Sequence, residues 1–411
     1  MDFADTPGEA EFRAEAAAFL EKHAEPLTGA NAVIRGRLPD DELLRRAREW
    51  QVLKAEAGFA AITWAPEHGG RGGTPMEQVI YAQEEARFAV PRGVYEIGLG
   101  MCVPTVITHG TPDQHARHVA PAVRGEEIWC QLFSEPAAGS DVAGLRTRAV
   151  RDGEDWVING QKIWTSGAHY ADWGLLLART DPNAAKHAGL TMFVIPMRAP
   201  GVEVRRIKQI AGTSNFNEVF FTDLRIPDSA RVGAVGAGWK VGLTTLMNER
   251  LTVGGSVGTD FDEIFALARD LETEDGTPAI RNPAVRERLA EWYVRSRGLK
   301  YTRFRTITRL SRGQTPGPES SIGKLVTASK MQEIASFALD LQGAAGVVMD
   351  RAVAPMQALF QETLLSAPGH RIAGGTDEIM RNIIAERVLG LPGDVRVDRD
   401  RPFSEIPAGK R

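Results

Sequence analysis

The sequence has little cysteine, little net charge and no long apolar run, and each shortage excludes a class of protein. Its two cysteines, Cys102 and Cys130, are too few for a disulfide framework or a cysteine-based metal centre. The eight histidines show no HExxH motif or other ligand spacing, so we expect no metal site. No apolar stretch is long enough to cross a bilayer, and residues 1–5 are acidic where a secretory signal would be basic. We therefore expect a soluble, unprocessed, cytoplasmic protein without a membrane span.

The charge balance argues against nucleic acid as a partner. The formal net charge is −4 over 411 residues, and arginines cluster only locally, along residues 294–312. The chain is long for a single hydrophobic core, so two or three subdomains are expected.

Hydrophobic periodicity divides the chain into three parts. Apolar residues recur at helical spacing up to about Arg124, short β-prone segments follow up to about Gly236, and helical spacing then returns. This pattern predicts an α+β protein that is mostly α. We expect an N-terminal helical domain at residues 1–127, a middle β domain forming a small barrel at 128–237, a C-terminal helical bundle at 238–395 and a tail at 396–411.

Three predictions concern the local structure of single segments. Residues 156–163 read as a β-hairpin that turns at Asn159-Gly160. Residues 348–364 read as one helix of the bundle. The charged, proline-interrupted residues 394–411 fit either a strap over the surface or another subunit, or a frayed end, and we expect fraying.

Two segments rich in small and hydroxyl residues stand out in the β domain. They are Phe133-Ser134-Glu135-Pro136-Ala137-Ala138-Gly139-Ser140-Asp141 and Lys162-Ile163-Trp164-Thr165-Ser166. Small residues let a backbone approach a planar ring and a pyrophosphate, the serine hydroxyls can bond flavin heteroatoms, and Trp164 offers a flat apolar face. Either segment alone is more often a turn or a core strand, but their order and spacing together predict one wall of a flavin pocket.

In these segments the chain resembles the acyl-CoA dehydrogenase family. The resemblance spans nearly the whole chain, from Phe12-Arg13 through Asn248-Glu249-Arg250-Leu251 to Gly374-Gly375-Thr376-Asp377-Glu378-Ile379. It implies the same order of domains, FAD as cofactor, an acyl-CoA substrate and an electron-transferring flavoprotein as acceptor. The implied reaction is the α,β-dehydrogenation of an acyl-CoA thioester to the 2-enoyl-CoA, as in fatty acid β-oxidation and lipid metabolism.

This reaction needs a base for the weakly acidic α-proton while the flavin N5 takes hydride from the β-carbon. In the family the catalytic Glu stands either directly before a Gly-Thr pair late in the chain or in the first helix of the C-terminal bundle. Here Gly374 occupies the late position and cannot accept a proton, whereas Glu249 fills the other, as in isovaleryl- and long-chain acyl-CoA dehydrogenases. An exposed or Arg-paired glutamate is the commonest fate of such a residue, but this complementarity makes Glu249 the predicted base.

The resemblance assigns further residues to the cofactor and the substrate. The implied cofactor-binding residues are Phe133, Ser134, Gly139, Ser140, Trp164, Ser166, Arg269, Thr376 and Glu378. The implied substrate-binding residues are Ser140, Arg250, Gly374 and Gly375, with the Gly374 N–H helping to polarise the thioester carbonyl. Arg250 could equally be structural, balancing buried carboxylates.

Arg269 matches an arginine that reaches the cofactor pyrophosphate of a neighbouring subunit, which implies a homodimer or homotetramer. The chain departs from the family there, because an acidic segment, 270–278, follows Arg269 and Asp340 replaces a usual glutamine. Since carboxylates repel a pyrophosphate, a hetero-oligomer completed by a paralogous subunit stays open. Two other functions also stay open: a flavin-dependent monooxygenase or oxidase on the same fold, and a partner subunit of a heteromeric dehydrogenase.

Overall fold

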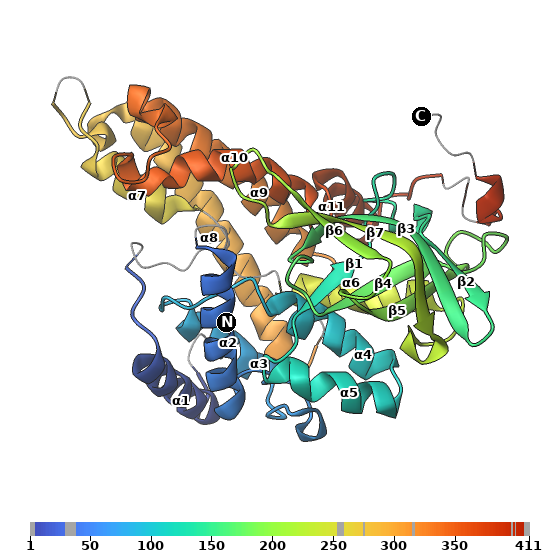
Figure 1. Ribbon diagram of the computed structural model, residues 1–411. Helices are drawn as coiled ribbons and strands as arrows, with labels where there is room; N and C mark the ends of the chain where they lie inside the picture. The colour runs from blue at the N-terminus through green and yellow to red at the C-terminus, as the bar shows by residue number, and fades with distance from the viewer. Residues whose placement is uncertain are drawn as a thin grey trace. The chain divides into compact units, whose positions relative to one another are not determined.

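The computed structural model describes residues 5–28, 38–252, 259–273, 276–314, 317–395, 398 and 400–406 (Figure 1). The chain divides into two compact units. The larger unit comprises residues 2–253 and 395–411, and the smaller comprises residues 254–394. The larger unit carries helices and a sheet, and the smaller is built from helices, so the predicted α+β, mostly α fold is confirmed.

The N-terminal region of the larger unit is helical, as predicted. Its helices are α1 (Pro7–His23), α2 (Asp40–Glu56), α3 (Pro75–Glu85), α4 (Val103–His109) and α5 (Pro112–Val123), with a π-helical turn at Gly98–Cys102 before α4. Helices α1, α3 and α5 each begin with proline after a threonine N-cap, and each threonine forms a capping box with the Glu or Gln three residues later. Local sequence therefore fixes where these helices start.

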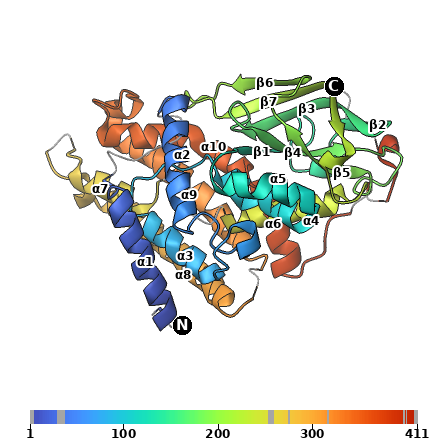
Figure 2. The same cartoon turned by 60° about the horizontal axis from the view of Figure 1, so that its bottom comes forward.

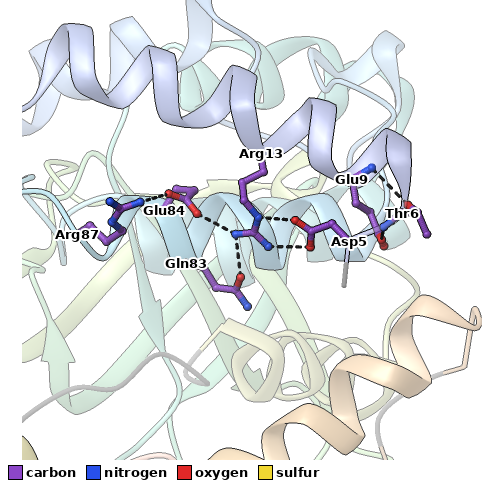
Figure 3. Close-up of polar contacts among 7 residues, drawn as sticks. All are labelled: Asp5, Thr6, Glu9, Arg13, Gln83, Glu84 and Arg87. Carbon is purple, nitrogen blue, oxygen red and sulfur yellow. Dashed lines mark hydrogen bonds and ion pairs between the residues drawn. The ribbon is translucent and has the colours of Figure 1, made fainter. Parts of the chain in front are cut away.

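An ion network fastens α1 to α3 (Figure 3). The guanidinium of Arg13 donates to both carboxylate oxygens of Asp5, at 2.6 and 3.0 Å, and to Glu84 at 2.8 Å. It also donates to Gln83 at 3.1 Å, while Arg87 donates to the other oxygen of the buried Glu84 at 2.7 Å. Because the hydrogen bond from Arg13 stabilises the carboxylate, the pKa of Asp5 is lowered.

The middle region is one curled sheet of eight strands. Its strands are β1 (Trp129–Leu132), β2 (Arg148–Asp152), β3 (Asp155–Ser166), β4 (Trp173–Arg179), β5 (Leu190–Pro196), β6 (Val202–Ile207), β7 (Phe216–Pro227) and β8 (Arg231–Val232). They lie in the order β6-β7-β3-β2-β4-β5-β8, and β1 pairs in parallel with β4. Among the described residues no ladder joins β6 to β8, so the sheet is open between these two strands.

The sheet has a core on each face. One core fills the inside of the curl, where Trp156 and Phe221 from β3 and β7 meet Phe193 from β5. The other face packs on α4, α5 and α6 (Gly238–Thr252), which lie together along β4 and β5 (Figure 2). The two predicted wall segments follow β1 and end β3, so both start from this doubly packed sheet.

The predicted turn at Asn159-Gly160 is wrong, because β3 runs straight through it. The hairpin turn lies at residues 152–155, between β2 and β3. The Asn159 amide instead exchanges two hydrogen bonds with Asp223 across the sheet, at 2.9 and 3.0 Å. A Cβ on Gly160 would lie 2.7 Å from the Thr147 Cα, so this glycine marks a close approach of two strands.

The smaller unit is a helical bundle. Its helices are α7 (Phe261–Asp270), α8 (Pro283–Ser311), α9 (Ser320–Leu341), α10 (Leu359–Ile372) and α11 (Asp377–Ile383). Its core joins the first four through residues such as Leu267, Trp292, Ile334 and Phe360.

The predicted helix at 348–364 is wrong over residues 348–358. After α9 the chain makes a short 3₁₀ turn at Gly343–Val347, and α10 begins only at Leu359. The three residues before Leu359 have φ angles of 52°, 53° and 59°, in the left-handed region that a continuous α-helix excludes. Apolar spacing alone did not reveal this interruption.

The described part of the tail is docked, so the prediction of a frayed end is wrong for residues 400–406. The Phe403 N–H donates to the Ala184 carbonyl at 3.0 Å, and the Ser404 N–H donates to the Pro182 carbonyl at 2.8 Å. The Phe403 side chain is buried, with its ring centroid 3.4 Å from the guanidinium carbon of Arg179. The tail is therefore a strap on the β domain.

Neither a metal centre nor a membrane-spanning helix is present among the described residues. No group of three or more His, Cys, Asp or Glu side chains is arranged to hold a metal ion. No described helix combines the length and apolar character that a membrane crossing requires.

His118 on α5 gives the fold a testable pH dependence. Its ring centroid lies 5.2 Å from that of Trp129 and 4.7 Å from that of Trp173. Burial, helped by the neighbouring Arg117, lowers the pKa of His118 from 6.5 to about 4. The unfolded chain therefore binds this proton first as the pH falls, so stability present above about pH 6.5 is lost towards pH 4.

We expect this loss to amount to about 2 kcal/mol between pH 7 and pH 5, and His118→Gln to remove it. Urea unfolding of both proteins at the two pH values, followed by tryptophan fluorescence, measures the difference. Equal pH slopes in the two proteins would contradict the assignment.

Candidate functional site

The two predicted wall segments lie side by side, since the Ile163 N–H donates to the Ser134 carbonyl at 2.9 Å. Beside this contact the ladder between β3 and β7 shifts register, and Trp164 takes a φ of 60°. A non-glycine residue in such a conformation costs about 1–3 kcal/mol and is characteristic of functional sites. The Trp164 side chain is 55% exposed and meets Phe216 edge to face. The bulge thus presents a flat apolar surface outward.

The serine hydroxyls of the two wall segments are available to a ligand. Ser134 and Ser166 are half-buried and Ser140 is exposed, next to the exposed Gly139. Within the described part of the chain, no hydrogen bond from any of the three hydroxyls to a protein group is found. Three uncommitted hydroxyls and an exposed indole on two adjoining segments fit a polar, planar ligand such as an isoalloxazine ring. The residues present therefore fit FAD.

Phe133 differs from its neighbours, because its side chain is buried in the core that faces α6. Any contact that it makes with a cofactor would come from its backbone or its ring edge.

A buried ion pair, which the sequence analysis missed, joins the two wall segments. Lys162 is fully buried, and its ammonium donates to a Glu135 carboxylate oxygen at 2.8 Å and to the Phe133 carbonyl at 3.0 Å. Glu135 also accepts the backbone N–H groups of Arg146, at 2.6 Å, and Thr147, at 2.8 Å. Burial would raise the pKa of Glu135, but the Lys162 ammonium and these hydrogen bonds outweigh it and lower that pKa. One signal was present in the sequence: the first segment carries carboxylates, at Glu135 and Asp141, and the second carries a cation, Lys162.

Two basic residues, Arg179 and Lys186, connect the strap to the same wall. Arg179, covered by Phe403, donates to two backbone carbonyls just after the first segment, at 2.6 and 3.2 Å. Lys186 pairs with Asp141 of that segment at 2.7 Å and with Asp398 of the strap. The wall is therefore held in place by hydrogen bonds and ion pairs from neighbouring segments.

Helix α6 carries the predicted base, but the side chains of Glu249 and Arg250 lie outside the described residues. The preceding turns of α6 are described. A Cβ on Gly238 would lie 2.5 Å from a strand backbone nitrogen, so the helix begins in close contact with the sheet. The hydroxyls of Thr245 and Thr105, both fully buried, are 2.9 Å apart and tie α6 to α4. Glu249 follows Thr245 by four residues along the same helix.

In the smaller unit, the predicted thioester and phosphate contacts form one turn. Gly374 and Gly375 have φ angles of 65° and 96°, and a Cβ on Gly375 would lie 2.5 Å from the Met380 methyl carbon. Thr376 caps α11, its hydroxyl accepting the Ile379 N–H at 3.2 Å. The Gly374 position is exposed, so its backbone is accessible to a ligand. Glu378 is also exposed, with 77% of its side chain accessible.

Arg269 is exposed and already engaged. Its guanidinium donates two hydrogen bonds of 2.6 Å to the carboxylate of Asp270, the first residue of the acidic segment. Asp340 is exposed as well. A pyrophosphate would have to compete with Asp270 for this arginine.

Comparison with protein families matches all three domains of one family. The matching models are described as the N-terminal domain of acyl-CoA dehydrogenase at residues 6–126, the middle domain at 130–224 and the C-terminal domain at 236–389. The chain belongs to the acyl-CoA dehydrogenase family. It is therefore an oxidoreductase of that family.

Two mycobacterial members of the acyl-CoA dehydrogenase family are similar to it. Acyl-CoA dehydrogenase IpdE1 of Mycobacterium tuberculosis is 38% identical over 391 residues, which cover 94% of this chain and 98% of IpdE1. Acyl-CoA dehydrogenase FadE34 of the same organism is 41% identical over 344 residues, which cover 83% of this chain. That match covers 46% of FadE34, so this chain corresponds to about half of that relative.

Solved structures of the family share the fold. The Tcur3481-Tcur3483 steroid ACAD aligns with a TM-score of 0.78 at 27% identity, covering 96% of this chain and 100% of the other. The ChsE4-ChsE5 complex from Mycobacterium tuberculosis aligns with a TM-score of 0.78 at 26% identity, with the same coverage.

Proposed function

We propose that the chain is an FAD-dependent acyl-CoA dehydrogenase that oxidises the Cα–Cβ bond of an acyl-CoA thioester, with Glu249 as the base. One observation carries the proposal: two adjoining segments present a strained, exposed Trp164 and three uncommitted serine hydroxyls on a scaffold of this family. Such a surface suits a flat ring with polar edges.

Each residue then has a defined task. Trp164 packs against the isoalloxazine, while Ser134, Ser140 and Ser166 donate to its heteroatoms; Ser140 also contacts the substrate. Thr376 and Glu378 hold the phosphate and ribose region. Bound FAD supplies a hydride acceptor for the β-carbon.

Glu249 accepts the α-proton, and the Gly374 N–H polarises the thioester carbonyl so that this proton becomes more acidic. A dry pocket would raise the pKa of the Glu249 carboxyl towards working pH. Arg250, next along α6, would help to shape the acyl-CoA pocket.

The substrate class is a CoA thioester, with two candidate acyl groups. Fatty acyl chains follow from the family, and the likeness to a steroid ACAD adds CoA thioesters of steroid acids. Electrons would pass to an electron-transferring flavoprotein.

A hetero-oligomer with a paralogous chain is the assembly that we favour over a homodimer or homotetramer. This chain corresponds to about half of FadE34, and one structural relative is a complex of two named components. The hydrogen bonds between Arg269 and Asp270 give a physical reason, because they occupy the guanidinium that a pyrophosphate would need.

Anaerobic mixing of the purified protein with acyl-CoA esters tests the function. We expect bleaching of the flavin absorbance with a fatty or a steroid acyl-CoA and no need for oxygen or a flavin reductase. Activity only with oxygen and a reductase would identify a monooxygenase or oxidase instead. A non-catalytic partner subunit would give a different result. Flavin and bleaching would then appear only after co-expression with the paralogous chain, and both would persist when this chain carries Glu249→Gln.

A further inference from the structure

We propose that Lys324, on α9, is a positioning residue that holds the Gly374-Gly375-Thr376 turn in its ligand-binding conformation. The proposal rests on the proposed function, in which this turn meets the thioester and FAD. Its observations lie entirely within the smaller unit.

The Lys324 ammonium fastens both ends of the turn. It donates to the carbonyl of Arg371, at the end of α10, at 3.1 Å, and to the carbonyl of Gly375. Only 19% of the Lys324 side chain is exposed, so these bonds are partly shielded from water. One cation thus ties the end of α10 to the residue before the α11 cap.

A buried carboxylate completes the cluster. The Asp377 side chain is 3% exposed and lies 3.8 Å from the Lys324 ammonium. It accepts a hydrogen bond of 2.7 Å from Arg371, which also donates to Gln332 of α9 at 3.1 Å. The Arg371–Asp377 pair therefore links the two ends of the turn, and Lys324 and Gln332 attach these ends to α9.

The turn needs such bracing because of its composition. Two consecutive glycines at positive φ have wide conformational freedom, and fixing them costs more entropy than fixing other residues. Hydrogen bonds from a cation are stronger than neutral ones, and a bond to the Gly375 carbonyl polarises the peptide that carries the Thr376 N–H. Lys324 would therefore both order the turn and strengthen a donor that faces the cofactor phosphate.

Lys324→Met in the holoenzyme tests the inference. We expect amide hydrogen exchange in residues 373–376 to rise about tenfold and FAD affinity to fall about tenfold, since the turn is no longer ordered before binding. Lys324→Arg keeps a cation with several donors and should restore part of both.

Lys330→Met is the matched control. Lys330 is the more deeply buried lysine of the same helix, and it bonds Asp260 at 2.5 Å and Ser296 at 2.7 Å, away from the turn. It should lower the melting temperature without changing exchange in the turn or FAD affinity; Ser296→Ala serves the same purpose if Lys330→Met does not fold.

The outcomes separate this inference from the proposed function. Wild-type exchange and FAD affinity in Lys324→Met, or equal changes in the Lys324 and Lys330 variants, would overturn the inference. Failure of every acyl-CoA to bleach the wild-type flavin would overturn the proposed function. The comparisons of hydrogen exchange and of FAD affinity between the Lys324 and Lys330 variants would still test the inference.

Discussion

Glu249→Gln should keep FAD bound and slow the reduction of that FAD by acyl-CoA by at least about 10²-fold. The amide keeps the shape and most polar contacts of the carboxylate but cannot take the α-proton, and a positioned base contributes about 10²–10⁴-fold to such a step. Rapid anaerobic mixing of variant and wild type with a substrate that bleaches the wild-type flavin measures the rate directly. Flavin content measured before mixing shows that the cofactor is still bound.

The matched control is Glu287→Gln, at an exposed glutamate of α8. Glu287 is distant in sequence from both Glu249 and the Gly374-Gly375-Thr376 turn. It should reduce its flavin at the wild-type rate. Unchanged reduction in Glu249→Gln would refute the base assignment while leaving the family unchanged, because the fold and the wall do not depend on this carboxylate. Loss of flavin from Glu249→Gln, by contrast, would show a binding role that the proposed mechanism does not give it.

The order of the domains was readable from the sequence because hydrophobic spacing changes twice along the chain. The two segments rich in small and hydroxyl residues were also recognisable from composition, and the hydrogen bond from Ile163 to Ser134 confirms that they lie side by side, while their role as a flavin wall stays a prediction. The bulge in the second segment was not recognisable. Nothing in the sequence around Trp164 shows that the ladder shifts register there, because the shift depends on how β3 pairs with β7.

Pairings between distant residues account for the other errors. Gly160 looked like a turn residue because Asn-Gly is a strong hairpin signal, but its neighbour across the sheet, Thr147, gives the real reason for a glycine. The strap looked like a frayed end because its docking depends on one stacked pair, Phe403 on Arg179, with no periodicity to reveal it. The sequence around Lys162 does not reveal its partner, and only the fold shows this lysine enclosed with Glu135.

Breaking the buried Lys162–Glu135 pair should lower the free energy of unfolding more than any other single change in the β domain. Lys162→Met leaves Glu135 buried without its cation, and removing one partner of a buried pair typically costs about 3–5 kcal/mol. Since Glu135 also accepts two backbone N–H groups of the wall, we expect the variant to lose FAD as well as stability. Urea unfolding followed by tryptophan fluorescence, with flavin retention measured in parallel, checks both effects.

The comparison that isolates the pair uses two more variants. Lys208→Met, at an exposed lysine of the same domain, should change stability by no more than about 0.5 kcal/mol. The double variant Glu135→Gln/Lys162→Met should recover part of the lost stability, because the glutamine side-chain oxygen can still accept a wall N–H while no charge stays buried. The pH dependence has a defined sign: because the pKa of Glu135 is lowered in the fold, the wild-type pair contributes fully above the ordinary carboxyl pKa of 4.5 and loses its contribution as the pH falls through the lowered value. A Lys162→Met protein as stable as Lys208→Met, or a double variant less stable than Lys162→Met, would mean that packing holds the wall and the ion pair does not.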